Sequence, residues 1–244
     1  MVLLLHGDCL EHLDTLEPNS IDLIFCDLPY GQTSCKWDCP IDLDILWNHF
    51  MRIKKLNTPI IMTCTTKFGV SLINTAPKKC PFRYDLVWCK SSPCGFLSAK
   101  KMPMRKHEMI YVFYEKLPIY DLSSHKHKFI KETEKTQISK PQEKDLYGAS
   151  AGGTIGNVHG TNYEPPLPDS LLEIKSTRGK HSTEKPVALM EWILKYYSKE
   201  GDVILDSTMG SGSMGVACNN MKRNFIGIEK DERIFNVAWE RLNL

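Results

Sequence analysis

The sequence predicts an α/β fold with a mostly parallel, doubly wound β-sheet. Short apolar runs bounded by turn residues alternate along the chain with segments of helical periodicity. A glycine-rich turn near the carboxyl end links a strand-like run to a helix-like one, a connection typical of open parallel sheets. A length of 244 residues suits one large domain of this class, or a domain with a small insert.

The first half of the chain alternates strand-like and helix-like segments. Apolar runs rich in β-branched and aromatic residues predict strands at residues 2–5, 21–26, 59–64, 84–89 and 109–114. Helices are predicted between them, at residues 9–16, 42–56 and 67–74. In the second helix, apolar side chains recur at helical spacing at Leu43, Leu46, Trp47 and Phe50.

The pattern fades near residue 115 and returns near residue 180. Lys, Ser, Gly, Pro and Asn dominate residues 115–179, and we expect an insert of loops or irregular structure there. Regular elements then resume, with helices at residues 186–197 and 231–242 and strands at residues 203–205 and 224–229. We therefore expect one sheet domain, made of residues 1–114 and 180–244, that the insert interrupts.

Composition excludes several classes of protein. The chain is 42% hydrophobic and 25% charged with a formal net charge of +2, so any contact with nucleic acid must come from local clusters of charge. The nine cysteines include no Cys-x-x-Cys pair, which argues against a zinc finger or a disulfide scaffold and for a reducing, cytoplasmic compartment. The apolar start ends at His6-Gly7-Asp8, too early for a signal peptide or a membrane span.

Residues 203–215 read VILDSTMGSGSMG and carry the spacing Gly-x-Gly-x-x-Gly at Gly210, Gly212 and Gly215. Such glycines let a ligand approach the backbone, and Glu229, at the end of the next strand, can accept hydrogen bonds from both hydroxyls of a ribose. A tight turn without a ligand is the simpler alternative. Asp206 would repel a dinucleotide pyrophosphate but attract the cationic groups of S-adenosylmethionine, which favours that methyl donor over NAD.

A second acidic strand end occurs at Asp27-Leu28-Pro29-Tyr30. If its strand neighbours that of Asp206, the tetrapeptide faces the methyl group of the donor. The amine of a nucleobase is a poor nucleophile, but the Asp27 carboxylate and the backbone carbonyl of Leu28 or Pro29 could hold both N–H bonds and localise the lone pair. We expect Tyr30 to stack on the base through its ring, with a dispensable hydroxyl. If the tetrapeptide stood alone, a simple Pro-Tyr turn after a strand would be the favoured interpretation.

Three motifs, in this order, resemble those of the amino-group DNA methyltransferases: Asp-Leu-Pro-Tyr-Gly at 27–31, His-Ser-Thr-Glu-Lys-Pro at 181–186 and Asp-Ser-Thr-Met-Gly-Ser-Gly-Ser at 206–213. The resemblance covers residues 2–115 and 180–242, and the order of its motifs is that of the β group. It implies a Rossmann-like, S-adenosylmethionine-dependent methyltransferase fold with residues 115–179 as the target-recognition insert. The family's usual tetrapeptide is Asp-Pro-Pro-Tyr, from which Leu28 departs.

The resemblance also implies site residues. The catalytic set is Asp27, Leu28, Pro29 and Tyr30. Asp8 matches the acid that accepts from the adenine amine of the donor, and Thr183 and Lys185 match the segment along its methionine end. The expected donor site comprises Asp8, Asp27, Thr183, Lys185, Asp206, Ser207, Thr208, Gly210, Ser211, Gly212, Glu229 and Lys230. No metal is expected.

Residues 90–106, KSSPCGFLSAKKMPMRK, hold five basic residues and no acid: Lys90, Lys100, Lys101, Arg105 and Lys106. A solvated loop is one interpretation, and a loop that contacts DNA phosphates beside the catalytic edge is the other. Cys94 follows a proline, as does the nucleophile of cytosine-C5 methyltransferases. The flanking residues do not match that family, and methylation of an amine needs no covalent intermediate, so we reject Cys94 as a nucleophile.

The sequence thus predicts a DNA methyltransferase that moves a methyl group from S-adenosylmethionine to N6 of an adenine flipped out of double-stranded DNA. Asp rather than Ser at the head of the tetrapeptide leans toward adenine, and cytosine N4 is the nearest alternative. An NAD-dependent oxidoreductase would leave residues 27–30 unexplained, and a silent DNA-binding module would not need the donor contacts. The resemblance also suggests a homodimer. Restriction-modification is one setting for such an enzyme, beside solitary regulation and viral modification.

Overall fold

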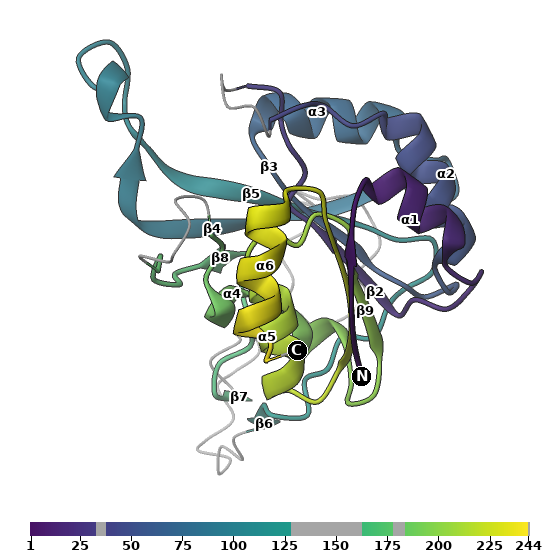
Figure 1. Ribbon diagram of the computed structural model, residues 1–244. Helices are drawn as coiled ribbons and strands as arrows, with labels where there is room; N and C mark the ends of the chain where they lie inside the picture. The colour runs from purple at the N-terminus through teal and green to yellow at the C-terminus, as the bar shows by residue number, and fades with distance from the viewer. Residues whose placement is uncertain (33–37, 128–162, 178–183, 244) are drawn as a thin grey trace, which may run out of the picture. The chain divides into compact units, whose positions relative to one another are not determined.

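The computed structural model of the protein describes residues 1–32, 38–127, 163–177 and 184–243 (Figure 1). Contacts within the chain divide it into two compact units, Met1–Asp121 with Ser170–Leu244, and Leu122–Asp169. The larger unit contains the main sheet and its helices. In the smaller unit, the described residues form a short antiparallel pair of strands, β6 (Lys126–His127) and β7 (Tyr163–Glu164).

The larger unit is built on an eight-stranded sheet in the order β1-β10-β9-β2-β3-β5-β4-β8. Its strands are β1 (Val2–His6), β2 (Leu23–Cys26), β3 (Ile60–Cys64), β4 (Phe82–Cys94), β5 (Arg105–Phe113), β8 (Leu171–Leu172), β9 (Val203–Asp206) and β10 (Asn224–Glu229). Every pairing is parallel except those of β5, which runs antiparallel to both β3 and β4. The predicted mostly parallel sheet is confirmed, with one reversed strand.

The helices cover both faces of this sheet (Figure 1). One face carries α1 (Cys9–Thr15), α2 (Leu43–Ile53) and α3 (Thr66–Thr75), and the other carries α4 (Val187–Tyr197), α5 (Ser213–Asn220) and α6 (Glu232–Arg241). Four of them begin after a side chain that accepts a hydrogen bond from a free N–H of the first turn: Asp8, Asp42, Thr65 and Asp231. Among the described residues, no helix has the length and apolar character to cross a membrane.

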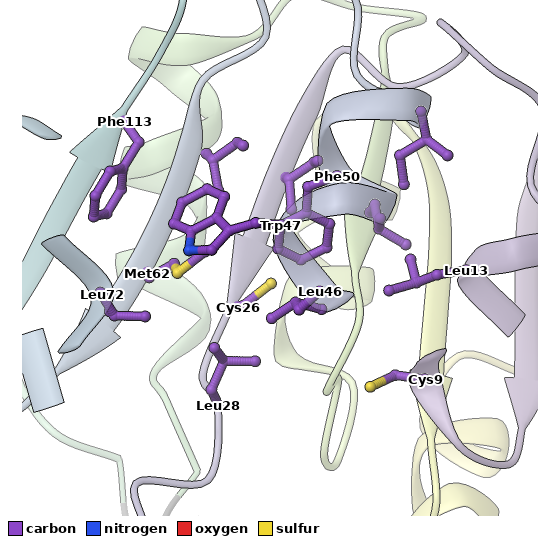
Figure 2. Close-up of a cluster of buried hydrophobic side chains, with 14 of the residues drawn as sticks. Cys9, Leu13, Cys26, Leu28, Leu46, Trp47, Phe50, Met62, Leu72 and Phe113 are labelled. Carbon is purple, nitrogen blue, oxygen red and sulfur yellow. The ribbon is translucent and has the colours of Figure 1, made fainter. Parts of the chain in front are cut away.

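A cluster of buried side chains lies between the sheet and helices α1 to α3 (Figure 2). β2 and β3 are buried along their whole length, as expected of strands that are covered on both faces. Trp47 and Phe50 enter the cluster from α2, and the Trp47 ring lies 5.2 Å from the Phe113 ring of β5, centroid to centroid. The helical spacing of apolar residues in the sequence therefore marks the face of α2 that packs on the sheet.

β2 and β9 are neighbours, and the chain leaves them in opposite directions. Phe25 of β2 pairs with Asp206 of β9. From β2 the chain passes through α2 to β3 on one side, and from β9 it passes through α5 to β10 on the other. Where the connections from two neighbouring parallel strands run to opposite sides in this way, a crevice opens at the carboxyl ends of those strands. The two acidic strand ends, Asp27 and Asp206, therefore meet at this crevice.

The hairpin of β4 and β5 is longer than the sequence predicts. The expected strands were residues 84–89 and 109–114, but the ladder continues past a register shift after Cys89, and Cys94 pairs with Arg105. The two ends of the segment expected as a loop, residues 90–94 and 105–106, therefore belong to an arm of two strands. A turn with the short 3-10 helix η1 (Phe96–Ser98) closes the arm, which extends from the sheet (Figure 1).

The smaller unit is shorter than the insert predicted at residues 115–179. The Asp121 N–H donates to the carbonyl of Tyr196 in α4 at 2.8 Å, which ties this part of the chain to the larger unit. On the other side, β8 pairs with β4, and the Val87 N–H donates to the carbonyl of Ser170 at 2.8 Å. Asp121 and Ser170 therefore belong to the larger unit, and the smaller unit spans Leu122–Asp169.

Replacing Phe50 tests whether the α2 contact stabilises the fold. Phe50 is fully buried, so Phe50→Ala leaves a cavity and should lower the free energy of unfolding by about 3–5 kcal/mol. Asn48, exposed on the same helix, is the matched control, and Asn48→Ala should change stability by less than about 0.5 kcal/mol. Urea unfolding followed by circular dichroism measures both. Equal stabilities of the two variants would contradict the assigned packing.

Candidate active site

A cavity of about 720 Å³ opens at the carboxyl ends of β1, β10, β9 and β2. Most of the expected donor site lines it: Asp8, Asp27, Lys185, Asp206, Ser207, Thr208, Gly210, Ser211, Glu229 and Lys230. Gly212 does not line the cavity and stands at the beginning of α5. Thr183 lies outside the described residues. The segment from Cys39 to Asp42 adds a wall that the sequence did not predict.

The tetrapeptide after β2 sends its side chains in different directions. Asp27 and Pro29 line the cavity, whereas the Leu28 side chain is buried in the core (Figure 2). Leu28 therefore has only its backbone to offer a ligand. The Tyr30 ring packs on Phe68, with 5.2 Å between the ring centroids.

The Asp27 carboxylate is held by Tyr30 of the same tetrapeptide and by side chains from two other parts of the chain. Its Oδ1 accepts a hydrogen bond from Thr63 Oγ1 and lies 3.0 Å from the Tyr30 hydroxyl, while its Oδ2 accepts from Lys185 Nζ at 2.5 Å. The Tyr30 hydroxyl also lies 2.9 Å from Glu108 Oε1. The sequence predicted no role for this hydroxyl, yet it contacts both carboxylates.

Lys185 and Glu108 extend the network away from Asp27. Lys185 Nζ lies 3.2 Å from Glu108 Oε1, and Glu108 Oε2 lies 2.7 Å from Lys90 Nζ. Burial by itself raises the pKa of Glu108, but the two lysines outweigh it and lower that pKa to about 2. Burial lowers the pKa of Lys185, and the carboxylates of Asp27 and Glu108 outweigh this effect, so the net shift is upward. Both Glu108 and Lys185 are therefore charged at neutral pH.

The three glycines of the loop after β9 serve two purposes. Gly210 and Gly212 have φ of +54° and +80°, a left-handed conformation that glycine adopts without strain. Gly215 instead allows α5 to approach β10, because a Cβ at this position would lie 2.8 Å from the ring of Phe225. The loop therefore turns sharply and brings backbone N–H groups to the cavity.

Glu229 and Asp8 stand at the ends of β10 and β1. The two Glu229 oxygens accept from the N–H groups of Gly210 at 3.0 Å and Asp231 at 2.8 Å, and each oxygen keeps a second lone pair for a ligand. Asp8 accepts from Leu10 N at 2.9 Å and from Lys230 Nζ at 2.9 Å. The hydrogen bond from Lys230 is the main cause that lowers the pKa of Asp8.

Asp206 is the most buried carboxyl group of the cavity, with 3% of its surface exposed. Burial, together with the nearby charges of Asp27 and Glu229, raises its pKa to about 8, although the Thr208 N–H donates to its Oδ1 at 3.1 Å. Without a ligand, Asp206 is therefore largely protonated at neutral pH. A cation in the cavity would favour the ionised form.

These groups fit S-adenosylmethionine. Three acids, Asp8, Asp206 and Glu229, offer acceptors for an amine, two hydroxyls and a positive charge. Thr208 Oγ1 is buried and has no hydrogen-bond partner among the described residues, as expected of a hydroxyl that binds a ligand. In the same part of the chain, no group of three or more His, Cys, Asp or Glu side chains is placed to hold a metal ion.

Two residues around the tetrapeptide were missed by the sequence analysis. Thr63 near the end of β3 and Glu108 in β5 both reach Tyr30. A feature of the sequence could have identified Glu108 as a functional residue. It is the one acid in the strand RKHEMIYVF, and it is buried there. Thr63 has none, because a threonine in a strand is ordinary.

Two further residues fix the loops around the cavity. Asp38 accepts from the N–H groups of Gly31 and Gln32 at 2.7 and 2.8 Å, which holds the turn after the tetrapeptide. Arg241 of α6 donates to the Ser211 carbonyl at 3.1 Å and pairs with Glu184 at 2.9 Å. Arg241 thereby joins the glycine loop to the segment that carries Lys185.

The basic residues of the arm fall into two groups. Four of them are exposed beyond the sheet: Lys100, Lys101, Arg105 and Lys106. The turn at the tip of the arm also exposes Phe96 and Leu97, at 81% and 99% of their surface. Lys90 differs, because it stands at the base of the arm and binds Glu108 beside the cavity.

Comparisons with known proteins identify the family of the chain. Residues 21–240 match the N6/N4 methyltransferase family model, described as DNA methylase. The type II methyltransferase M.HinfI of Haemophilus influenzae is 27% identical over 98% of this chain and 67% of its own length. A crystal structure of an M1.HpyAVI–SAM complex superposes with a TM-score of 0.67 at 22% identity, over the whole of both chains. The cytosine-N4-specific PvuII DNA methyltransferase superposes with a TM-score of 0.65 at 13% identity, over 98% of this chain and 86% of its own.

The family match covers most of the chain, and the structural likenesses confirm the expected fold. The cavity also carries the acids, the glycine loop and the acidic tetrapeptide that the sequence predicted at one edge of the sheet. The protein belongs to the N6/N4 family of DNA methylases and uses S-adenosylmethionine as its methyl donor.

Proposed function

We propose that the protein methylates N6 of adenine in double-stranded DNA, on a base that has left the duplex. The observation that carries this proposal is the position of Asp27, which lines the donor cavity at the end of β2 and is held by side chains on both carboxylate oxygens. S-adenosylmethionine supplies an electrophilic methyl group when it is bound. The chain must then supply hydrogen-bond acceptors that hold the amine that receives the methyl group.

The Asp27 carboxylate suits that task. It is fixed by Thr63, Tyr30 and Lys185, so it need not reorganise when the amine arrives. A carboxylate has about four lone-pair sites, and the contacts with these three side chains leave capacity for one N–H of the base. The backbone carbonyl of Leu28 or Pro29 would accept the other N–H. Held in this way, the nitrogen lone pair is drawn out of the ring and becomes nucleophilic.

Cytosine N4 is the second candidate target. Its amine has the same chemistry, and the fold is shared with the cytosine-N4-specific PvuII enzyme. Asp at the head of the tetrapeptide supports adenine. Methylation of a plasmid of mixed sequence, followed by mass spectrometry of its nucleosides, decides between them: N6-methyladenine is expected, and N4-methylcytosine without it would overturn the choice of base.

We propose that the exposed end of the arm contacts the DNA backbone. Lys100, Lys101, Arg105 and Lys106 carry four positive charges, and residues 90–106 contain no acid to oppose them. Lysine and arginine at such a surface position a duplex through its phosphates without reading its sequence. The likeness to type II methyltransferases supports a place in restriction-modification, and residues 115–179 remain the proposed target-recognition region.

Removing the carboxylate tests the proposed grip on the amine. Asp27→Ala should lower the single-turnover rate of methyl transfer by at least about 10²–10³-fold, because the lost contact strengthens in the transition state. Binding of S-adenosylmethionine, measured by calorimetry, should change little. Lys185 keeps Glu108 as a partner in this variant, which limits structural damage. Near-wild-type turnover would contradict the mechanism.

The acids at the ends of β1 and β10 should contribute to donor affinity. Asp8→Ala and Glu229→Ala should each weaken S-adenosylmethionine binding by about 1–3 kcal/mol, because each removes an acceptor from a partly buried polar ligand. Glu232 is exposed on α6 and does not line the cavity, so Glu232→Ala serves as the control and should bind normally. If both cavity variants bound as tightly as this control, the donor would lie elsewhere.

Asp206 should couple donor binding to pH. In the free protein its pKa is about 8, and the positive charge of the donor should lower it, so binding should release a proton below that pH. Affinity should therefore rise as the pH increases from about 6 to about 8 and then level off. Calorimetry in buffers of different ionisation enthalpy counts the released proton. Asp206→Asn, which keeps an acceptor for Thr208, should abolish that release, and an unchanged proton count would refute the coupling.

A further inference from the structure

Four charged side chains form a line from the cavity to the base of the arm, in alternating sign. Asp27 and Lys185 are 2.5 Å apart, Lys185 and Glu108 are 3.2 Å apart, and Glu108 and Lys90 are 2.7 Å apart. The side chains of Lys185 and Glu108 are each 10% exposed, and that of Lys90 is 19% exposed. Asp27, at the cavity end of the line, is 27% exposed. The other three side chains are mostly shielded from solvent, and charge pairs interact strongly in such surroundings.

Lys90 is built into this line. Glu108 pairs with Trp88 across the ladder of β4 and β5, and the Lys90 ammonium lies over the Trp88 ring, 5.2 Å from its centroid. The ring face and the Glu108 carboxylate both attract a cation, so they hold the ammonium at the sheet. The other basic residues of the arm lie beyond it, in solvent.

Glu108 affects how Lys185 acts on Asp27. A buried ammonium whose only partner is Asp27 would occupy the lone pairs that the target amine needs. Glu108 offers Lys185 a second carboxylate and also contacts the hydroxyl of Tyr30, which touches Asp27. Lys90 in turn balances the charge of Glu108, so the four groups sum to zero.

We propose that Glu108 and Lys90 are positioning residues for methyl transfer, which orient Asp27 through Lys185 and Tyr30, and that Lys90 acts in this network rather than on a DNA phosphate. The inference rests on the proposed function, in which Asp27 holds the target amine. A phosphate contact and a positioning contact have different signatures. Loss of a phosphate contact weakens DNA binding and flattens its dependence on salt, whereas loss of positioning slows the chemical step on DNA that is already bound.

The test compares Lys90→Met and Glu108→Gln with Lys101→Ala as a reference for a lost phosphate contact. Methionine keeps an apolar stem over Trp88, and glutamine keeps the shape of Glu108. Both variants should lower the single-turnover rate at saturating DNA by about 10–100-fold, since small errors in position slow transfer strongly. Their slopes of DNA affinity against salt should match wild type, whereas Lys101→Ala should reduce the slope by about 1.

Two more variants make the result specific. Lys90→Arg, which restores the charge, should recover most of the rate, and the double variant Lys90→Met with Glu108→Gln should be no slower than its slower single variant, since both residues act through the same route. Thermal unfolding shows whether each variant is folded. If Glu108→Gln fails to fold, the comparison of Lys90→Met with Lys90→Arg carries the test.

Transfer of a tritiated methyl group to DNA counts methylation of any base, so an error in the target base does not affect the test. If Asp27→Ala remains active, the proposed function itself fails. If Asp27→Ala is inactive but Lys90→Met and Glu108→Gln transfer at the wild-type rate, the positioning role alone is wrong. If Lys90→Met showed a weaker dependence of DNA affinity on salt and an unchanged single-turnover rate, Lys90 would be a phosphate contact and not a positioning residue.

Discussion

Two carboxyl groups end neighbouring strands at one edge of the sheet, and the site depends on how their charges are accommodated. Asp27 and Asp206 follow β2 and β9, which pair directly. The protein treats them in opposite ways. Asp27 receives a buried ammonium from Lys185, whereas Asp206 receives a single backbone N–H and has a pKa of about 8. One acid is therefore ready to accept a hydrogen bond, and the other is ready to ionise when a cation enters.

Most parts of the site that the sequence predicted share one property, because each is a short continuous segment at the end of a strand; the segment with Lys185, which precedes α4, is the exception. Asp27 to Tyr30, Gly210 to Gly215 and Glu229 need only their own strand and the turn after it to reach the cavity edge. Periodicity marked those strands, and the parallel arrangement gathers their carboxyl ends at one edge. The sequence did not establish that the strands of Asp27 and Asp206 are neighbours, and the structure shows that they are.

The parts that were missed depend on long-range pairing. Glu108 reaches Tyr30 and Lys185 because β5 inserts between β3 and β4, and no local pattern encodes that order. Thr63 and Asp38 act on the tetrapeptide from other segments through single hydrogen bonds. The sequence predicts a loop at residues 90–106, whereas the ladder of β4 and β5 resumes beyond a register shift. Lys90 then appeared to belong with the exposed lysines, although it lies at the sheet.

The separation of Lys185 from its partners along the chain has a consequence for synthesis. Asp27 precedes Lys185 by 158 positions, so the amino-terminal half leaves the ribosome with the Asp27 carboxylate in place and its cation still unmade. Until the segment before α4 has been added, the carboxyl end of β2 lacks the ammonium that pairs with Asp27. The carboxyl end of β2 therefore stays hydrated in the nascent chain. The catalytic end of the molecule excludes water and becomes ordered only after the last third of the chain has been synthesised.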